Sequence, residues 1–135
     1  MTTSLAFNDA TTLSPKAQRE QDIDLVMHAA IEYHRKAEYS DARTLYEIVL
    51  NSDDDHVDAN YHLGVLHMQT GDPANAVPLF ERVLGHTPNF AQLWVYYFNA
   101  LVGSNQFEAA RASLFLAQEY GVPVEAINAL RAQLP

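Results

Sequence analysis

The stretch of sequence that decides the fold lies at residues 63–88 and reads LGVLHMQTGDPANAVPLFERVLGHTP. It contains two runs of apolar residues at three- and four-residue spacing, and this spacing predicts two amphipathic helices. Between the two runs, Gly71 suits the end of the first helix, and Asp72 and Pro73 suit the start of the second. The stretch therefore predicts a helical hairpin.

The same pattern recurs with a period of 34 residues, in the rows Ile23–His56, Val57–Phe90 and Ala91–Val124. Each row carries an alanine, a large apolar residue four positions later and a smaller apolar residue after three more: Ala42, Tyr46 and Val49; Ala76, Phe80 and Val83; Ala110, Leu114 and Ala117. A fixed period of this length is typical of stacked helical hairpins, in which each unit buries its apolar face against its neighbours. We predict an all-α protein: an α-solenoid of three helical hairpins in a right-handed superhelix, closed by a C-terminal capping helix.

The flanks of the repeats suggest how the chain is divided. Residues 1–13 are rich in polar residues without helical periodicity, which predicts a flexible tail. Ser14 and Pro15 suit the start of a first helix, so residues 14–135 are expected to form a single domain. The capping helix is expected at residues 123–133, where Val124, Ile127 and Leu130 recur every three residues.

Composition limits the classes of function. The chain has 135 residues, 48% of them hydrophobic, and a formal charge of −9. This acidic balance disfavours nucleic acid and anionic membranes as partners, but it would attract a small basic partner. The chain has no cysteine, no apolar run near the ~20 residues that a membrane span needs, and no secretory signal pattern at its start. We therefore predict a cytoplasmic protein.

The middle row resembles the tetratricopeptide repeat (TPR) family. Its Leu63-Gly64, Gly71, Ala76, Phe80 and Pro88 fall where the family has Leu-Gly, Gly, Ala, Phe and Pro. Glycine and alanine lack bulk, so the two helices of a hairpin can approach closely at these positions.

The third row departs from the family pattern at one place. It has Tyr97 and Phe98 where small residues are expected. We expect the third hairpin either to be splayed or to pack differently against the final helix.

A second resemblance concerns the third row. Phe90–Trp94, Ala100-Leu101, Gln106–Glu108 and Gly121 are similar to repeats of bacterial proteins that join TPR stacks to a glycosyltransferase domain. This resemblance implies an alternative function, in which the chain is the N-terminal repeat region of a larger protein glycosyltransferase.

In the TPR family the first helices of the hairpins line a concave groove. The resemblance places ten candidate partner-binding residues there: Met27, His28, Ile31, Tyr61, His62, Val65, Met68, Val95, Tyr96 and Asn99. These positions lack the paired lysines and asparagines that grip a peptide carboxylate, and they lack an asparagine ladder. We expect an apolar groove for an amphipathic helix or an extended apolar peptide, although several of these residues can equally pack within the stack.

Metal and catalytic sites are not predicted. His28 and His62 lie one repeat apart, so they sit on adjacent hairpins about 10 Å apart, too far to share one zinc ion. Asp53, Asp54 and Asp55 do not match a calcium loop and are expected to cap the following helix. Nucleophile elbow, phosphate loop and dinucleotide motifs are absent from the sequence. We therefore expect no enzyme activity, no cofactor and no metal.

The functional prediction is a non-catalytic protein–protein interaction module that binds a protein or peptide partner through the groove. Self-association into a homo-oligomer is a variant, with Phe115 and Leu116 as candidate contacts. Besides the glycosyltransferase region, a small TPR chaperone or assembly scaffold is the other alternative.

Overall fold

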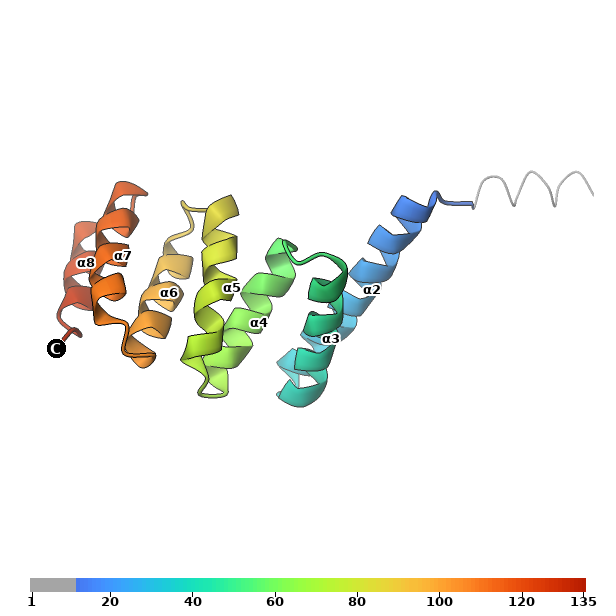
Figure 1. The fold of residues 1–135 in the computed structure, drawn as a ribbon, viewed down its shortest axis with the longest axis horizontal. Coiled ribbons are helices and arrows are strands. Elements are labelled where there is room, and N and C mark those ends of the chain that lie inside the picture. The colour runs from blue at the N-terminus through green and yellow to red at the C-terminus, as the bar shows by residue number, and fades with distance from the viewer. Residues whose placement is uncertain (1–11) are drawn as a thin grey trace, which may run out of the picture.

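The computed structural model describes residues 12–135, and it contains seven helices and no strands within that range. The helices are α2 (Pro15–Arg35), α3 (Tyr39–Ser52), α4 (Val57–Gln69), α5 (Pro73–His86), α6 (Ala91–Gly103), α7 (Phe107–Glu119) and α8 (Val124–Arg131). They form an elongated stack that runs from α2 at one end to α8 at the other (Figure 1). The predicted all-α fold of stacked hairpins with a closing helix is confirmed. Of the predicted flexible tail, residues 1–11 lie outside the described residues.

The three hairpins turn in the same way. Ala37, Gly71 and Asn105 lie one repeat apart, and their φ angles are 61°, 77° and 61°. After each of them, a backbone N–H reaches back to a carbonyl oxygen near the end of the helix: Glu38 to Tyr33 at 2.9 Å, Asp72 to His67 at 2.8 Å and Gln106 to Leu101 at 2.8 Å. Each of these helices thus ends with a residue in the left-handed backbone conformation, which glycine adopts without steric cost. Ala37 and Asn105 adopt it with a Cβ atom present, so the turn stores strain at these two positions.

These turns set where the neighbouring helices begin and end. α3 begins at Tyr39, because the left-handed Ala37 brings the chain into the next helix within two residues. α6 ends at Gly103, and Asn105 makes the turn into α7.

The aspartates before α4 do not cap that helix as predicted. The cap is His56, whose Nδ1 accepts a hydrogen bond from the backbone N–H of Ala59 at 3.1 Å. Asp53 instead accepts from the backbone N–H of Asp55 at 3.1 Å, and Asp55 pairs with His86 of α5 at 2.8 Å. The acidic run therefore shapes the loop and ties it to the next hairpin.

The core consists of two clusters that meet at α5. The first cluster joins α2, α3 and α4, and it includes Leu79 of α5. The second cluster extends from Ala76 and Phe80 of α5 to α8. All nine residues that define the period are buried, with at most 2% of their surface exposed. The period therefore marks the positions where successive helices press together.

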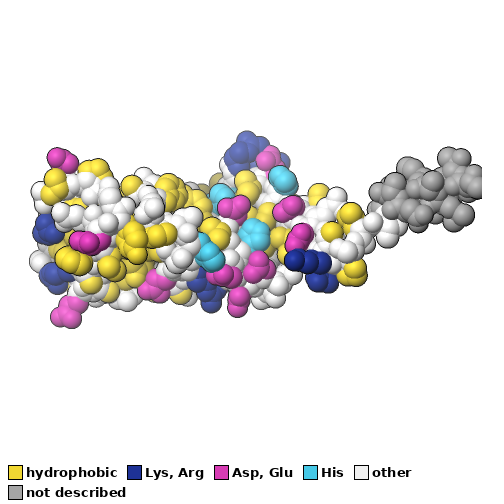
Figure 2. Space-filling view, turned by 90° about the horizontal axis from the view of Figure 1, so that it is seen from above, with side chains coloured by type: hydrophobic (Ala, Val, Ile, Leu, Met, Phe, Trp, Pro, Cys, Tyr) yellow, Lys and Arg dark blue, Asp and Glu magenta, His cyan; other side chains and the backbone are white. Residues whose placement is uncertain are grey.

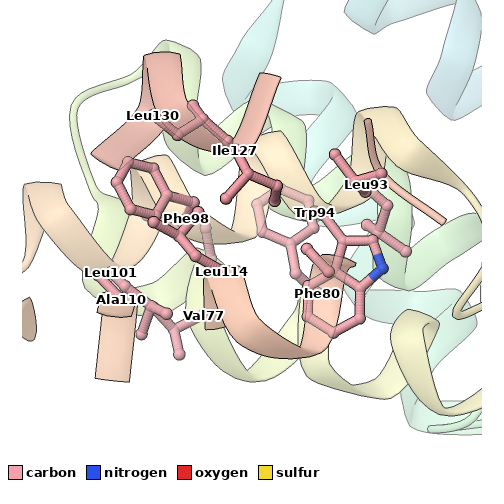
Figure 3. Packing of buried hydrophobic residues seen from close by; sticks show 14 of the residues in the cluster. Val77, Phe80, Leu93, Trp94, Phe98, Leu101, Ala110, Leu114, Ile127 and Leu130 are labelled. Carbon is pink, nitrogen blue, oxygen red and sulfur yellow. The ribbon is translucent and has the colours of Figure 1, made fainter. Parts of the chain in front are cut away.

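In the third hairpin the larger residue of the contacting pair lies on the first helix and the smaller one on the second, which reverses the arrangement in the second hairpin. In the second hairpin a Cβ atom on Gly64 would lie 2.6 Å from the ring of Phe80, so only glycine leaves room for that ring. The equivalent pair in the third hairpin is Phe98 and Leu114, both buried. Figure 3 shows Phe98 in the same cluster as Ile127 and Leu130 of α8. Of the two predicted alternatives, the structure shows packing against the final helix.

None of the helices in the described part of the chain is both long and apolar enough to span a membrane.

Candidate functional site

Two adjoining pockets lie along the first helices of hairpins one and two. One has a volume of about 150 Å³ and is lined by Asp24, Met27, His28, Ile31, His56 and Asp58. The other has a volume of about 330 Å³ and is lined by Val57, Asp58, Tyr61, His62, Val83, Thr87 and Phe90. Because Asp58 lines both pockets, they form one continuous surface, which we call the groove.

The groove has an apolar floor and accessible apolar sides. Met27 is only 6% exposed and lies at the base of the first pocket. Ile31 is 37% exposed and Phe90 is 45% exposed, so both present apolar surface to a partner. The Tyr61 ring lies 6.0 Å from the Phe90 ring and 6.1 Å from the Tyr96 ring, which gives this side of the groove three aromatic faces.

Half of the ten predicted site residues line the groove, namely Met27, His28, Ile31, Tyr61 and His62. Tyr96 touches it through its ring contact with Tyr61. Val65, Met68 and Val95 are half-buried and pack against the second core cluster, and Asn99 is half-buried and lines neither pocket. The structure thus places some predicted residues on the surface of the groove and others in the stack beneath it, and their role in binding stays a prediction.

Sequence reasoning missed two groove residues that occupy the same position in successive repeats. His56 and Phe90 lie 34 positions apart, and each directly precedes the first helix of a hairpin. Both line the groove. The residue before each first helix is therefore a further groove position of the repeat.

A hydrogen-bonded cluster beneath the groove joins the first two hairpins. Nε2 of His34 lies 2.6 Å from Oε1 of Gln69, and Nδ1 of His34 lies 2.9 Å from the hydroxyl of Tyr46. A carbonyl oxygen only accepts, so His34 donates through Nε2, and in the neutral ring Nδ1 accepts from Tyr46. The Tyr46 ring stacks on His62 at 6.0 Å, and burial raises the pKa of Tyr46 to about 12. The cluster fixes α2 relative to α4, and thereby the two parts of the groove.

One histidine of the groove, His62, is shifted towards its neutral form. Burial lowers the pKa of His62 below its ordinary value, although the nearby Asp58 opposes this effect. His28 also bonds to its own helix, with Nδ1 2.9 Å from the carbonyl oxygen of Asp24. In the described range 12–135, no three histidine, aspartate or glutamate side chains are placed to hold a metal ion.

The architecture and period define a helical-repeat protein of the α-solenoid class, and sequence comparison identifies which one. Two tetratricopeptide repeat profiles match the chain, one at residues 67–134 and the other at residues 29–91. The chain therefore belongs to the tetratricopeptide repeat family, as its sequence predicted. No curated protein sequence matches it significantly.

Solved structures of similar fold support this assignment. MamA from Desulfovibrio magneticus RS-1, in a structure that spans residue 41 to the end of that protein, superposes with a TM-score of 0.68 at 21% identity, and the match covers 76% of this chain and 58% of that chain. The match thus spans little more than half of the solved MamA chain. The Yersinia enterocolitica type III secretion chaperone SycD, in complex with a peptide of the translocator YopD, has a TM-score of 0.69 at 14% identity, with coverage of 82% and 89%. The first TPR of Spaghetti (RPAP3), bound to the HSP90 peptide SRMEEVD, has a TM-score of 0.68 at 15% identity, with coverage of 83% and 90%.

Proposed function

We propose that this chain is a protein-interaction module that binds an apolar segment of a partner protein in the groove. The observation that carries the proposal is the pair of exposed apolar side chains, Ile31 and Phe90, in pockets that Met27 and Tyr61 also line. Apolar surface that is both accessible and concave favours an amphipathic helix or an extended peptide. The peptide complexes of SycD and of the RPAP3 repeat support this use of the fold.

We further propose that the module is not catalytic. Several of its hydroxyl groups are engaged locally: Thr70, Ser104 and Ser113 each donate to a backbone carbonyl of their own helix, at 3.0 Å, 2.7 Å and 2.7 Å. Groups held in this way serve helix geometry and are poorly placed to act as nucleophiles. A cytoplasmic location, suggested by the absence of cysteine, is part of the same proposal.

Three narrower roles stay predictions. Phe115 and Leu116 are exposed on α7, so self-association through that helix has surface available to it. The chaperone or scaffold role draws on the similarity to SycD, which extends over most of both chains. The glycosyltransferase role rests on the resemblance of the third repeat alone.

A peptide selection tests the groove while the partner is still unidentified. Peptides enriched from a random library on the wild-type protein are measured by fluorescence anisotropy against Ile31→Ser and Leu25→Ser. Both residues lie on α2 and are exposed, but Leu25, at 65% exposure, lines neither pocket of the groove. The matched pair therefore separates loss of the groove from loss of any apolar surface on this helix.

We expect Ile31→Ser to weaken binding about tenfold, because it removes roughly 1–2 kcal/mol of apolar contact. Leu25→Ser should bind as the wild type does. Equal affinities of the two variants, or no enriched peptide at all, would rule out the groove as the binding surface. Thermal unfolding by circular dichroism should give both variants a melting temperature close to that of the wild type.

A further inference from the structure

The charged side chains that line the groove are all negative, apart from its histidines. Asp24 lines the first pocket and Asp58 lines both. All eight lysines and arginines of the chain fall among the described residues, at positions 16–131, and none of them lines either pocket. On the face shown in Figure 2, histidine side chains gather in the middle of the molecule together with several acidic side chains, and lysine and arginine side chains lie in separate small groups.

Neither groove carboxylate belongs to an ion pair among the described residues. The ion pairs within residues 12–135 involve Glu32, Glu47, Asp72 and Asp55, and they include neither Asp24 nor Asp58. Asp58 stands in the first turn of α4, where it also favours the helix dipole. Asp24 lies inside α2, away from both ends, so the dipole gives no reason for its charge.

We propose that the partner segment is basic as well as apolar, with lysine or arginine side chains that meet Asp24 and Asp58 between its apolar anchors. This inference rests on the proposed function and names the chemistry of its ligand. Cations placed at the junction of the two pockets would also lie near the aromatic faces of Tyr61 and Phe90, which attract cations. A carboxylate-rich peptide such as the SRMEEVD sequence bound by the RPAP3 repeat would be repelled.

A second copy of this chain is a poorer occupant on the same grounds. Each copy carries a formal charge of −9, so two copies repel each other at low ionic strength. A basic segment is attracted by the same field.

The test uses three fluorescein-labelled peptides that alternate leucine with arginine, with glutamine or with glutamate. Their affinities for the full chain are measured by anisotropy at low and at high salt. The double variant Asp24→Asn/Asp58→Asn removes the groove charges with little change in side-chain shape. The control Asp41→Asn/Glu108→Gln makes the same change of net charge, and both of its residues are exposed and lie in the first turns of α3 and α7.

The arginine peptide should bind about tenfold or more tightly than the glutamate peptide, and its affinity should fall with salt. The groove double variant should lose about three- to tenfold affinity for the arginine peptide and none for the glutamine peptide, as expected for two exposed ion pairs. The control double variant should keep most of the affinity for the arginine peptide.

The outcomes separate the two proposals. Equal binding of the arginine and glutamate peptides, with loss of both in Ile31→Ser, overturns the basic ligand and leaves the apolar groove standing. An equal loss in the two double variants also overturns it, because the attraction then comes from net charge alone. Arginine-peptide binding that Ile31→Ser leaves intact overturns both proposals. A dimer in sedimentation that Ile31→Ser dissociates, together with no affinity for any peptide, assigns the groove to a second copy and overturns the basic ligand.

Discussion

The close contact between α4 and α5 at Gly64 gives the sharpest test of the packing. A Cβ atom at this position would lie 2.6 Å from Cε1 of Phe80 and 2.9 Å from both Cδ1 and Cζ. Carbon atoms in contact are normally about 3.5–4.0 Å apart, so Gly64→Ala requires the ring to move by roughly 1 Å. The Phe80 ring is fully buried and stacks on Tyr96 at 5.7 Å, which leaves it no open space.

The size of the effect follows from two opposing terms. Alanine is a better helix former than glycine by about 1 kcal/mol, and overpacking a core costs about 1–3 kcal/mol. We therefore expect Gly64→Ala to lower the free energy of unfolding by about 1 kcal/mol. The control is Gly85→Ala in α5, where a Cβ atom would meet nothing within 4 Å, so it should raise that free energy by about 0.5–1 kcal/mol.

Urea denaturation followed by far-UV circular dichroism measures both variants. Both variants gain a similar amount from the higher helix propensity of alanine, so this gain largely cancels when their free energies of unfolding are compared. The remaining difference should be about 1–3 kcal/mol and report the steric clash. If Gly64→Ala proves as stable as Gly85→Ala, the reasoning from close approach is refuted. The third hairpin suggests a compensating substitution, because it accommodates Phe98 opposite Leu114. Adding Phe80→Leu to Gly64→Ala should therefore recover part of the lost stability, with a coupling energy of about 1 kcal/mol.

Three further predictions concern the turn, the buried hydroxyl and pH. Ala37→Gly should raise the free energy of unfolding by about 0.5–1 kcal/mol in urea denaturation, because glycine relieves the left-handed strain at φ 61°; lower stability would contradict this. Tyr46→Phe should cost about 1 kcal/mol in the same assay, because it removes the hydroxyl that bonds to a histidine nitrogen at 2.9 Å; an unchanged value would mean that water replaces that bond without cost. Burial lowers the pKa of His62 in the folded state, so below pH ~6.5 the unfolded chain binds more protons and stability should fall as the pH falls; His62→Gln should flatten this dependence, and an equally steep fall in that variant would contradict the assignment to His62.

Most of the fold could be predicted from the 34-residue period of the sequence. Ala42, Ala76 and Ala110 were predicted as contact positions because only small residues let two helices approach closely, and all three are fully buried. The left-handed conformation of Ala37 and Asn105 was not predicted, because alanine disfavours it and asparagine tolerates it without requiring it. The packing of consecutive helices imposes it, and the alignment of both residues with Gly71 was the available signal.

The groove could be predicted only in part. The repeat positions predicted which helices line the groove and half of the residues that do so. The shape of a pocket, however, depends on where neighbouring side chains leave space between them. Phe90 enters the groove from a loop, and Val65 turns towards the core, and neither fact follows from helical spacing. The negative charge of the groove was present in the sequence, at Asp24 and Asp58. Only the structure shows that no lysine or arginine side chain lines the same pockets.

The exchange of large and smaller residues at Phe98 and Leu114 makes the three repeats unequal as building blocks. The first two hairpins carry a small residue and an aromatic ring at the same repeat positions, buried Ala30 and Tyr46 in the first and Gly64 and Phe80 in the second, so a designer could duplicate or exchange them with little repacking. The third hairpin shares its cluster with α5 on one side and with α8 on the other, so its second helix already has its closing partner. Lengthening this solenoid should therefore succeed by insertion before residue 91 and fail by insertion between α7 and α8.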